Sequence, residues 1–464
     1  MNHIDQKIRL FHWTNQSAIF SVWDMSSSQW LKRDREVVAQ SPYAPPLVLE
    51  RGRGCELWDV DGRRFLDFEA GQFCMNTGHS HPSVTEAISR QATVLMQIGN
   101  RFTTPARIQL AERLAALAPD PLGVTFFCST GSEANETALR IAKLVTGRFE
   151  VVALARGYHG RTASAYGLSS ATRRMRRGAG PQMPGIVHID TPYAYRCPFA
   201  CGTCDQRCWR HSVEMIDRAS SGEPAAVIVE FIQGAGGIIP VPADWAREVR
   251  RFCDERGALL IADEALTGLG RTGRWFAFEH TEVVPDIVVT SKALGGGVPA
   301  AAVITSREIA AAALAKGFVQ SASHQGDPFQ CAVALANLDV METEDLPGNA
   351  ERMGRRLMDG LRELTARHRL AGDARGIGLI AGLEIVDSDK DGGGETPELA
   401  AAVSVACLER GLIVGGLRPG IREGNTLRLA PPLTVSAQEI DEALTILDSA
   451  LTDVAAASMA GARQ

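Results

Sequence analysis

The sequence lacks the features of a membrane or secreted protein. No apolar run approaches the ~20 residues that a membrane-spanning helix needs. The first residues, MNHIDQKIRL, show no apolar core after a basic start, so we expect no signal peptide. Most of the ten cysteines lie singly in apolar segments, which is typical of a reducing compartment. We therefore expect a cytoplasmic protein that does not use a membrane.

The chain also lacks a strong excess of one charge. Lysine and arginine total 48, aspartate and glutamate total 54, and the net charge is -6. A nucleic-acid-binding surface would need a basic excess, so we expect no nucleic-acid partner. There is no internal repeat and no low-complexity tract. With 464 residues, of which 45% are hydrophobic, the chain is long enough for a large domain with a smaller one attached.

One cysteine cluster is the exception to the scattered pattern. Cys197, Cys201, Cys204 and Cys208 fall within CPFACGTCDQRC. Four thiols in twelve residues could bind zinc or an iron–sulfur cluster, form two loop disulfides, or stay reduced in a surface loop. The spacing lacks the paired C-x2-C motifs of zinc knuckles, so we favour reduced thiols and predict no metal site.

The order of hydrophobic patterns predicts an α/β fold. Helical periods alternate with short, nearly all-apolar strands, which is the pattern of a mostly parallel sheet covered by helices on both faces. The strands expected are GVTFFCS, EVVALA, GIVHI, AAVIVEF, ALLIADE, DIVVTS and AAAVITS. We predict a large domain over residues 76–340 and a smaller α+β domain over residues 341–464. Residues 1–75 should supply an N-terminal segment and antiparallel strands, with a turn at Asp61-Gly62, that join the small domain.

Polar residues follow several of these strands, where open α/β sheets bind ligands. Lys292 follows DIVVTS and precedes three glycines, whereas a nucleotide-binding P-loop places its glycines before the lysine. A buried lysine would have a lowered pKa and would be available as the amine. Asp263 and Glu230 follow two other strands, and Tyr158 follows a third. Thr130, Gly131 and Ser132 begin a helix, whose free amides suit a phosphate.

An amine, an acid, an aromatic ring and a helix N-terminus that can bind phosphate together suit pyridoxal 5'-phosphate (PLP). The sequence resembles the class III, or omega, aminotransferase family of fold-type I PLP enzymes from about residue 40 to residue 450. The motifs that carry the resemblance are STGSEANETALRIAK, GYHGRT, IADEALTGLGRTGRWFAFE, PDIVVTSKALGGGVPAAAVI and LRLAPPLTVSAQEID. Within the family, FLDFEAGQFCMNTGHSHP looks most like 2,2-dialkylglycine decarboxylase.

The resemblance implies a role for each matching residue. Lys292 would be the Schiff-base lysine, Asp263 the partner of the pyridine nitrogen, and Tyr158 the residue stacked on the ring. Thr130, Gly131 and Ser132 would hold the phosphate, with Ser323 from the other subunit. Glu230 would support the cofactor, and Arg428 would bind a substrate carboxylate. The partners implied are an amino donor, a 2-oxo acid acceptor and a second copy of the chain, as a homodimer or a dimer of dimers.

The resemblance implies the cofactor, but the cofactor alone does not choose the reaction. Gln72 matches a glutamine that helps the decarboxylase hold a carboxylate for cleavage, although it could also be satisfied by neighbouring backbone. Arg161 matches an arginine that many omega-aminotransferases use for a distal carboxylate. Ala235 replaces a glutamate that pairs with the C-terminal arginine in many relatives, so Arg428 should stay available. Leu266 replaces a glutamine that touches the ring's phenolic oxygen. Asp327 could cap a turn or bind an alkali cation.

We therefore expect an aminotransferase, with decarboxylation-coupled transamination as the favoured variant. An ordinary omega or amino-acid aminotransferase without decarboxylation is the main alternative. An amino-acid racemase or epimerase on the same fold is a further one.

Overall fold

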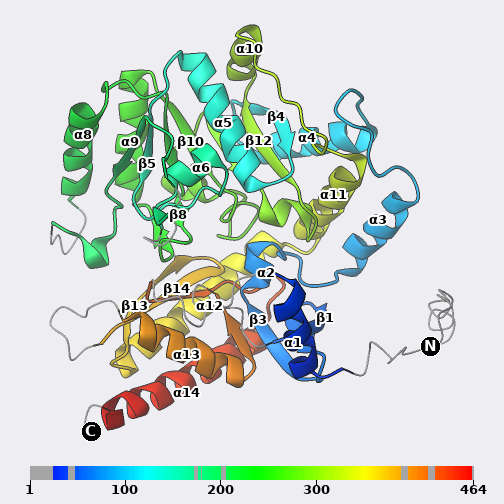
Figure 1. Ribbon diagram of the computed structural model, residues 1–464, viewed down its shortest axis with the longest axis vertical. Coiled ribbons are helices and arrows are strands. Elements are labelled where there is room, and N and C mark those ends of the chain that lie inside the picture. Colours follow the sequence, from blue (N-terminus) through cyan, green and yellow to red (C-terminus); the bar gives the residue numbers. More distant parts are fainter. Residues whose placement is uncertain are drawn as a thin grey trace.

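The computed structural model describes residues 25–39, 47–171, 176–178, 180–199, 205–387, 396–415 and 424–461. Its upper part in Figure 1 is a seven-stranded sheet flanked by helices, and its lower part holds smaller sheets and the C-terminal helices. The order of the large sheet is β4-β12-β11-β10-β7-β5-β6. These strands are β4 (Leu122–Cys128), β5 (Val151–Leu154), β6 (Ile186–Ile189), β7 (Ala226–Val229), β10 (Leu259–Asp263), β11 (Ile287–Thr290) and β12 (Ala301–Ser306).

The large sheet is buried on both faces, as the continuous apolar strands predict. Alternate residues of β5, β7, β10 and β11 belong to two separate core clusters. One cluster contains Ile141 from α5 (Gly131–Thr146), and the other contains Trp245 from α9 (Ala243–Arg256), so these helices cover opposite faces. Further helices around the large sheet are α4 (Pro105–Leu117), α6 (Ala163–Leu168), α8 (Arg207–Ala219) and α10 (Arg307–Ala315).

One strand runs against the others. We expected AAAVITS among the parallel strands, but β12 is antiparallel to both of its neighbours, β11 and β4. Only residues 291–300 separate β11 from β12, and a parallel crossover needs a dozen residues or more. The short link therefore forces the chain to turn back beside β11.

The lower part joins strands from both ends of the chain. β1 (Leu49–Arg53), β2 (Glu56–Asp59) and β3 (Arg64–Phe68) form an antiparallel ribbon around the turn at Gly62, and β15 (Leu412–Val414) pairs parallel to β3. A second sheet has the order β13-β14-β16, with bounds Ala371–Ile377, Ile380–Ile385 and Thr426–Leu429. β8 (Ile232–Gln233) and β9 (Ile239–Pro240) form a short ribbon. We retain residues 75 and 340 as proposed domain limits.

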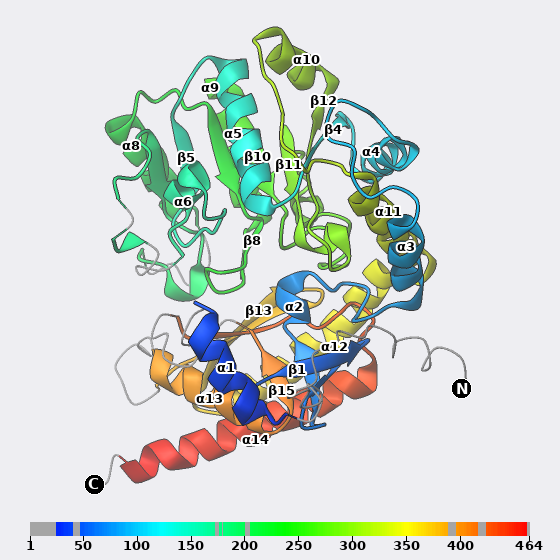
Figure 2. The ribbon, with the colours of Figure 1, turned by 45° about the vertical axis from the view of Figure 1, so that its right-hand side comes forward.

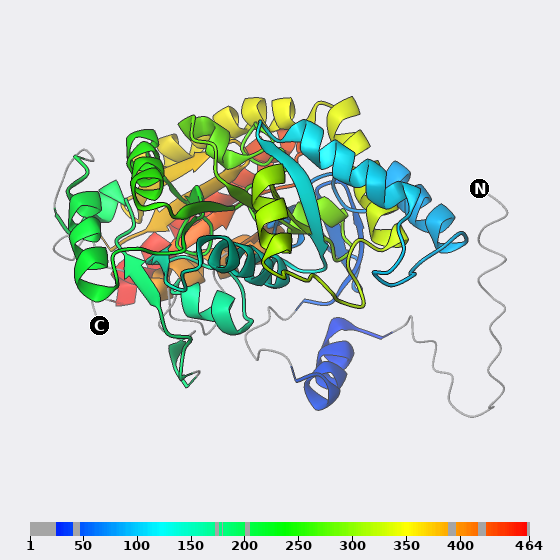
Figure 3. The same ribbon diagram turned by 90° about the horizontal axis from the view of Figure 1, so that it is seen from above.

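Long helices connect and cover these sheets. α3 (Pro82–Ala92) packs along α11 (Pro328–Thr343), and Figure 2 shows the pair running beside the large sheet toward the lower part. α12 (Leu346–Arg367) and α13 (Pro397–Glu409) pack on the small sheets, and α14 (Ala437–Gly461) packs against these two helices. α1 (Ser27–Val37) stands away from the body in Figure 3. In the described ranges no helix is both long enough and apolar enough to cross a bilayer.

Candidate active site

Lys292 begins the short helix η4 (Lys292–Gly295), directly after β11 and Ser291. Its φ angle is 39°, a left-handed conformation that a side chain disfavours and that often marks a functional position. Burial lowers the pKa of the Lys292 ammonium, and the positive charge of Arg428 adds to that effect, whereas the Asp263 carboxylate opposes it. Lys292 is therefore predisposed to act as an amine, as the sequence predicts.

Asp263 ends β10, and its side chain is buried. Its Oδ2 accepts hydrogen bonds from His159 Nδ1 and from Asn135 Nδ2, each at 2.8 Å. Burial by itself would raise the pKa of Asp263, but the hydrogen bond and charge of His159, with Lys292 nearby, hold it below its usual value. The same pair raises the pKa of His159 against the opposing effect of burial. The site thus contains a buried carboxylate that stays ionised.

The N-terminus of α5 lies beside the strand that leads to Lys292. Thr130 caps the helix, with its Oγ1 accepting from Glu133 N at 3.3 Å. Gly131 and Ser132 follow, at positions whose amides have no partner within a helix. A Cβ on Gly131 would lie 3.4 Å from Ser291 Cβ, so the start of α5 is close to the residue before Lys292. The start of α5, which we predict binds the phosphate, is therefore close to Lys292 in the fold.

Tyr158 lies on a loop after β5 that is fixed by a buried glutamate. Glu230 Oε1 accepts from Tyr158 N at 2.7 Å, and Oε2 accepts from Gly234 N at 3.1 Å. Burial raises the pKa of Glu230 to about 7. The loop also touches α5, because Ser132 Oγ accepts from Arg161 N at 3.1 Å. Glu230 thus orders the segment that presents Tyr158.

A second buried glutamate lies next to Asp263. Glu264 Oε1 accepts from Phe278 N at 2.9 Å, and its Oε2 accepts from the Thr267 hydroxyl. Burial raises the pKa of Glu264 to about 7. These contacts hold the turn that follows β10, and they lie outside the group formed by Lys292 and Asp263.

Gln72 lies on an unusual turn, α2 (Ala70–Phe73), at the boundary between the two parts in Figure 1. The φ angles of residues 70–73 are 47°, 56°, 60° and 67°, so the turn is left-handed. Asp67 stabilises it: Oδ1 accepts from Glu69 N and Ala70 N at 2.9 and 3.0 Å, and Oδ2 accepts from Gly71 N at 3.2 Å. The Gln72 side chain is exposed. In the sequence, Gly71 is the one residue of this turn that indicates a left-handed conformation.

Arg428, on β16, lies over the Phe73 ring at 5.6 Å and influences the charge of Lys292. Its Nη2 is 3.8 Å from Glu69 Oε1. A different segment thus places a carboxylate, that of Glu69, beside Arg428, and the availability of Arg428 to a substrate carboxylate stays a prediction. Leu266 takes up the space above Gly234, where a Cβ would lie 2.5 Å from Leu266 Cδ1.

Two predicted residues lie further out. The Arg161 and Ser323 side chains are exposed, and the Ser323 carbonyl accepts from Gln97 Nε2 at 2.8 Å. The next carbonyl, that of His324, accepts from the Ser129 hydroxyl near the start of α5. The segment with Ser323 therefore lies near the start of α5 in its own chain, and its proposed role toward the other subunit stays a prediction.

Asp327 and the four-cysteine segment were the two candidate metal sites in the sequence. Asp327 Oδ2 is 2.7 Å from His324 Nδ1 at the start of α11, and its side chain makes no cap hydrogen bond. Cys201 and Cys204 lie outside the described residues, so the four-cysteine hypothesis stays untested. Among the residues that are described, no group of three or more His, Cys, Asp or Glu side chains could hold a metal.

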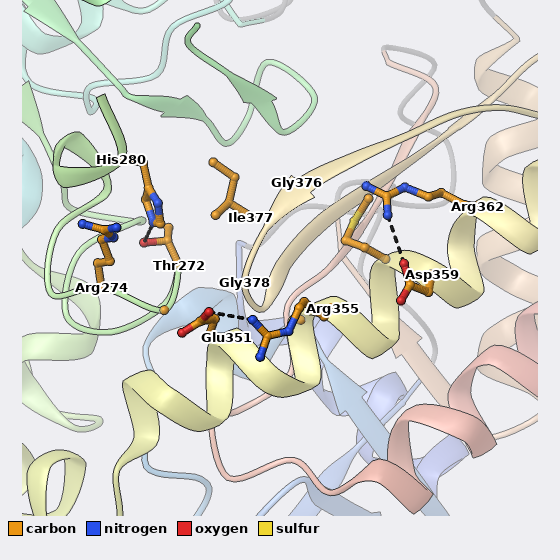
Figure 4. Close-up of a pocket in the computed structure, with 13 residues that line it drawn as sticks. Thr272, Arg274, His280, Glu351, Arg355, Asp359, Arg362, Gly376, Ile377 and Gly378 are labelled. Carbon is orange, nitrogen blue, oxygen red and sulfur yellow. Dashed lines mark hydrogen bonds and ion pairs between the residues drawn. The ribbon is translucent and has the colours of Figure 1, made fainter. Parts of the chain in front are cut away.

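A cavity of about 480 Å³ lies away from these groups, between the two parts of the molecule. Figure 4 shows that Thr272, Arg274 and His280 line one side and that Glu351 and Arg355 of α12 line the other. None of the predicted site residues lines this cavity. The group around Lys292 therefore remains the candidate active site, and this cavity adds no residue to it.

Comparisons with known proteins cover nearly the whole chain. The family model described as aminotransferase class-III matches residues 37–451. An uncharacterized aminotransferase of Schizosaccharomyces pombe is 40% identical, over 91% of this chain and 94% of its own. A probable 4-aminobutyrate aminotransferase of Bacillus subtilis is 36% identical, over 92% and 98%. A PLP-bound amine transaminase from an uncultivated Pseudomonas species has a TM-score of 0.83 at 32% identity, over 90% and 98%.

Proposed function

Because the chain belongs to the class III aminotransferase family, we propose that it moves an amino group from a donor whose carboxylate binds Arg428 to a 2-oxo acid acceptor. Its fold is that of the fold-type I PLP enzymes, and PLP is its cofactor. The observation that carries the proposal is the arrangement around Lys292. A buried amine with a lowered pKa lies within electrostatic reach of the Asp263 carboxylate and the Arg428 guanidinium.

The described residues suit this cofactor. The start of α5, at Gly131 and Ser132, supplies amides and a helix dipole for the phosphate. Asp263 remains a carboxylate and suits a protonated ring nitrogen. Gly160 allows the Tyr158 loop to lie against α5, since a Cβ there would clash with the Ser132 side chain. Once bound, PLP acts as an electron sink for a bond broken at the substrate's α-carbon.

Residues of the chain itself transfer the proton, orient the Asp263 carboxylate and bind the substrate. The lowered pKa of Lys292 leaves its Nζ able to accept a proton and return it, which is general acid–base catalysis. His159 and Asn135 keep the Asp263 carboxylate oriented and charged. Arg428 can bind a carboxylate through two parallel hydrogen bonds and so fix which bond of the substrate reacts.

Replacement of Lys292 tests the proposal directly. Lys292→Ala should abolish transfer of an amino group from an α-amino acid to pyruvate or 2-oxoglutarate, because Lys292 is the amine whose charge acts on Asp263. The loss should also remove the absorbance of lysine-bound PLP. Retained turnover in the purified variant would overturn the assignment.

Decarboxylation-coupled transamination is a second candidate, and the placement of Gln72 favours it. Gln72 and Phe73 share one turn, and the Phe73 ring lies against Arg428, so Gln72 is on a segment that borders the carboxylate-binding arginine. The test is to mix the holoenzyme with 2-aminoisobutyrate and pyruvate and to measure CO2 and acetone. Transamination of simple amino acids without CO2 from this donor would exclude the variant. Gln72→Ala should reduce CO2 release and spare ordinary transamination, whereas equal loss of both would refute its role.

A homodimer is part of the proposal. Val94, Met96 and Phe102 are 70%, 52% and 66% exposed. Their segment contacts the one that carries Ser323, through Gln97 Nε2 and the Ser323 carbonyl. An apolar surface next to the predicted phosphate-binding serine supports a partner that covers both. Sedimentation of the holoenzyme as a monomer at micromolar concentration would contradict it.

A further inference from the structure

Glu69 lies beside Arg428, the arginine that we propose binds a substrate carboxylate. Glu69 Oε1 is 3.8 Å from Arg428 Nη2, and the two side chains are 27% and 20% exposed. This distance makes the contact between these two atoms an ion pair and not a hydrogen bond. Arg428 also lies near enough to Lys292 to lower its pKa. A carboxylate of the protein itself therefore faces the arginine that we propose binds the substrate.

The small size of Gly415 makes room for this carboxylate. Gly415 and Arg428 exchange both backbone hydrogen bonds, each at 2.9 Å, so the two residues are directly opposite each other. A Cβ on Gly415 would lie 3.1 Å from Glu69 Cγ and 3.2 Å from Glu69 Oε1. These distances are tighter than ordinary contact, so any larger residue at position 415 would push the Glu69 side chain away.

The backbone of Glu69 is fixed as well. Its amide donates to Asp67 Oδ1 at 2.9 Å, and its carbonyl accepts from Phe73 N at 2.9 Å. The Phe73 ring lies against the same guanidinium that Glu69 faces. The left-handed turn thus presents a carboxylate and an aromatic ring to Arg428 together.

We propose that Glu69 is a specificity-determining residue, an internal counter-ion that a substrate carboxylate displaces from Arg428. With a carboxylate-free amine in the site, Glu69 still compensates the half-buried guanidinium. With an anionic substrate, the partly exposed Glu69 side chain turns toward solvent and Arg428 binds the ligand. The inference rests on the proposed role of Arg428, and it assigns to Glu69 the discrimination between anionic and neutral substrates.

The test compares two small ligands that differ in charge and barely in shape. Propionate and propionamide are titrated into the holoenzyme, and each Kd is measured by calorimetry and by the absorbance of bound PLP. Glu69→Gln keeps the shape of the side chain and removes its charge. Since partly exposed ion pairs contribute modestly, propionate should bind about two- to fivefold more tightly to this variant. The Kd of propionamide should not fall.

Two further variants distinguish a failure of the inference about Glu69 from a failure of the role proposed for Arg428. Gly415→Ala keeps the charge of Glu69 but crowds its side chain, so it should also tighten propionate binding. Arg428→Gln should weaken propionate binding; if it does not, the proposed role of Arg428 fails. If Arg428→Gln weakens propionate while Glu69→Gln leaves its Kd unchanged, only the inference about Glu69 fails. Equal effects of Glu69→Gln on both ligands, or no binding of propionate to any variant, would also overturn it.

Discussion

The left-handed turn at residues 70–73 should depend on a single carboxylate. Ala70, Gln72 and Phe73 carry side chains in a conformation that disfavours them by about 1–2 kcal/mol each. Asp67 offsets this strain with its bonds to three backbone amides, and its Oδ2 also lies 2.7 Å from His79 Nε2. In Asp67→Asn, Oδ1 can still accept two hydrogen bonds, but an NH2 group replaces Oδ2 and cannot accept from Gly71.

The expected loss of stability has two sources. The asparagine cannot make the hydrogen bond to Gly71, and the acceptor of the other two hydrogen bonds loses its charge. Hydrogen bonds to a charged acceptor contribute about 1.5–3 kcal/mol each, so the turn should lose about 2–4 kcal/mol of local stability in Asp67→Asn. That loss raises the local opening equilibrium about 30- to 900-fold. Hydrogen–deuterium exchange of peptides spanning residues 66–75 measures it, with peptides from β11 as the internal control. Unchanged exchange in this segment would refute the idea that Asp67 holds the turn.

Two further predictions concern buried groups elsewhere. Glu264→Gln should raise Tm above that of the wild type at pH 8 and match it near pH 5. In the folded wild type, the pKa of the Glu264 carboxyl is about 7. The wild-type protein therefore loses up to about 3 kcal/mol of its free energy of unfolding as pH rises from about 4.5 to about 7. Parallel Tm–pH curves would contradict this. On α12, Gly354→Ala should lower Tm much more than Gly360→Ala: a Cβ on Gly354 would clash with the backbone of Gly378, whereas one on Gly360 meets only the tip of the Leu444 side chain. Equal shifts would count against the close backbone contact.

The sequence predicted the large sheet well because its strands are buried on both faces and therefore read as continuous apolar runs. It also predicted that Lys292, Asp263 and the start of α5 would share a sheet edge, because strand ends meet there. The direction of β12 was missed, although the ten residues between β11 and β12 were a usable signal. The length of a link constrains strand direction more than the apolar pattern does.

His159 and Glu69 were not predicted as site residues, for two different reasons. His159 was next to Tyr158 in a recognised motif, and a histidine there could have been considered as a partner for Asp263. Glu69 offered no such signal, because its neighbour Arg428 is far away in sequence. Which carboxylate meets an arginine across such a separation depends on how β3, β15 and β16 assemble, and local pattern does not encode this.

The pairing of Leu66 with Leu412 has a consequence for biosynthesis. The segment that forms the large sheet, from β4 to β12, is contiguous and can assemble while the ribosome is still translating. The ribbon of β1, β2 and β3 is made earlier but must wait for β15, which emerges near the end of synthesis. Until then one edge of β3, with its buried Leu66 and Phe68, is open to other chains. Nascent chains that stall before residue 412 should therefore be the ones that aggregate or engage chaperones.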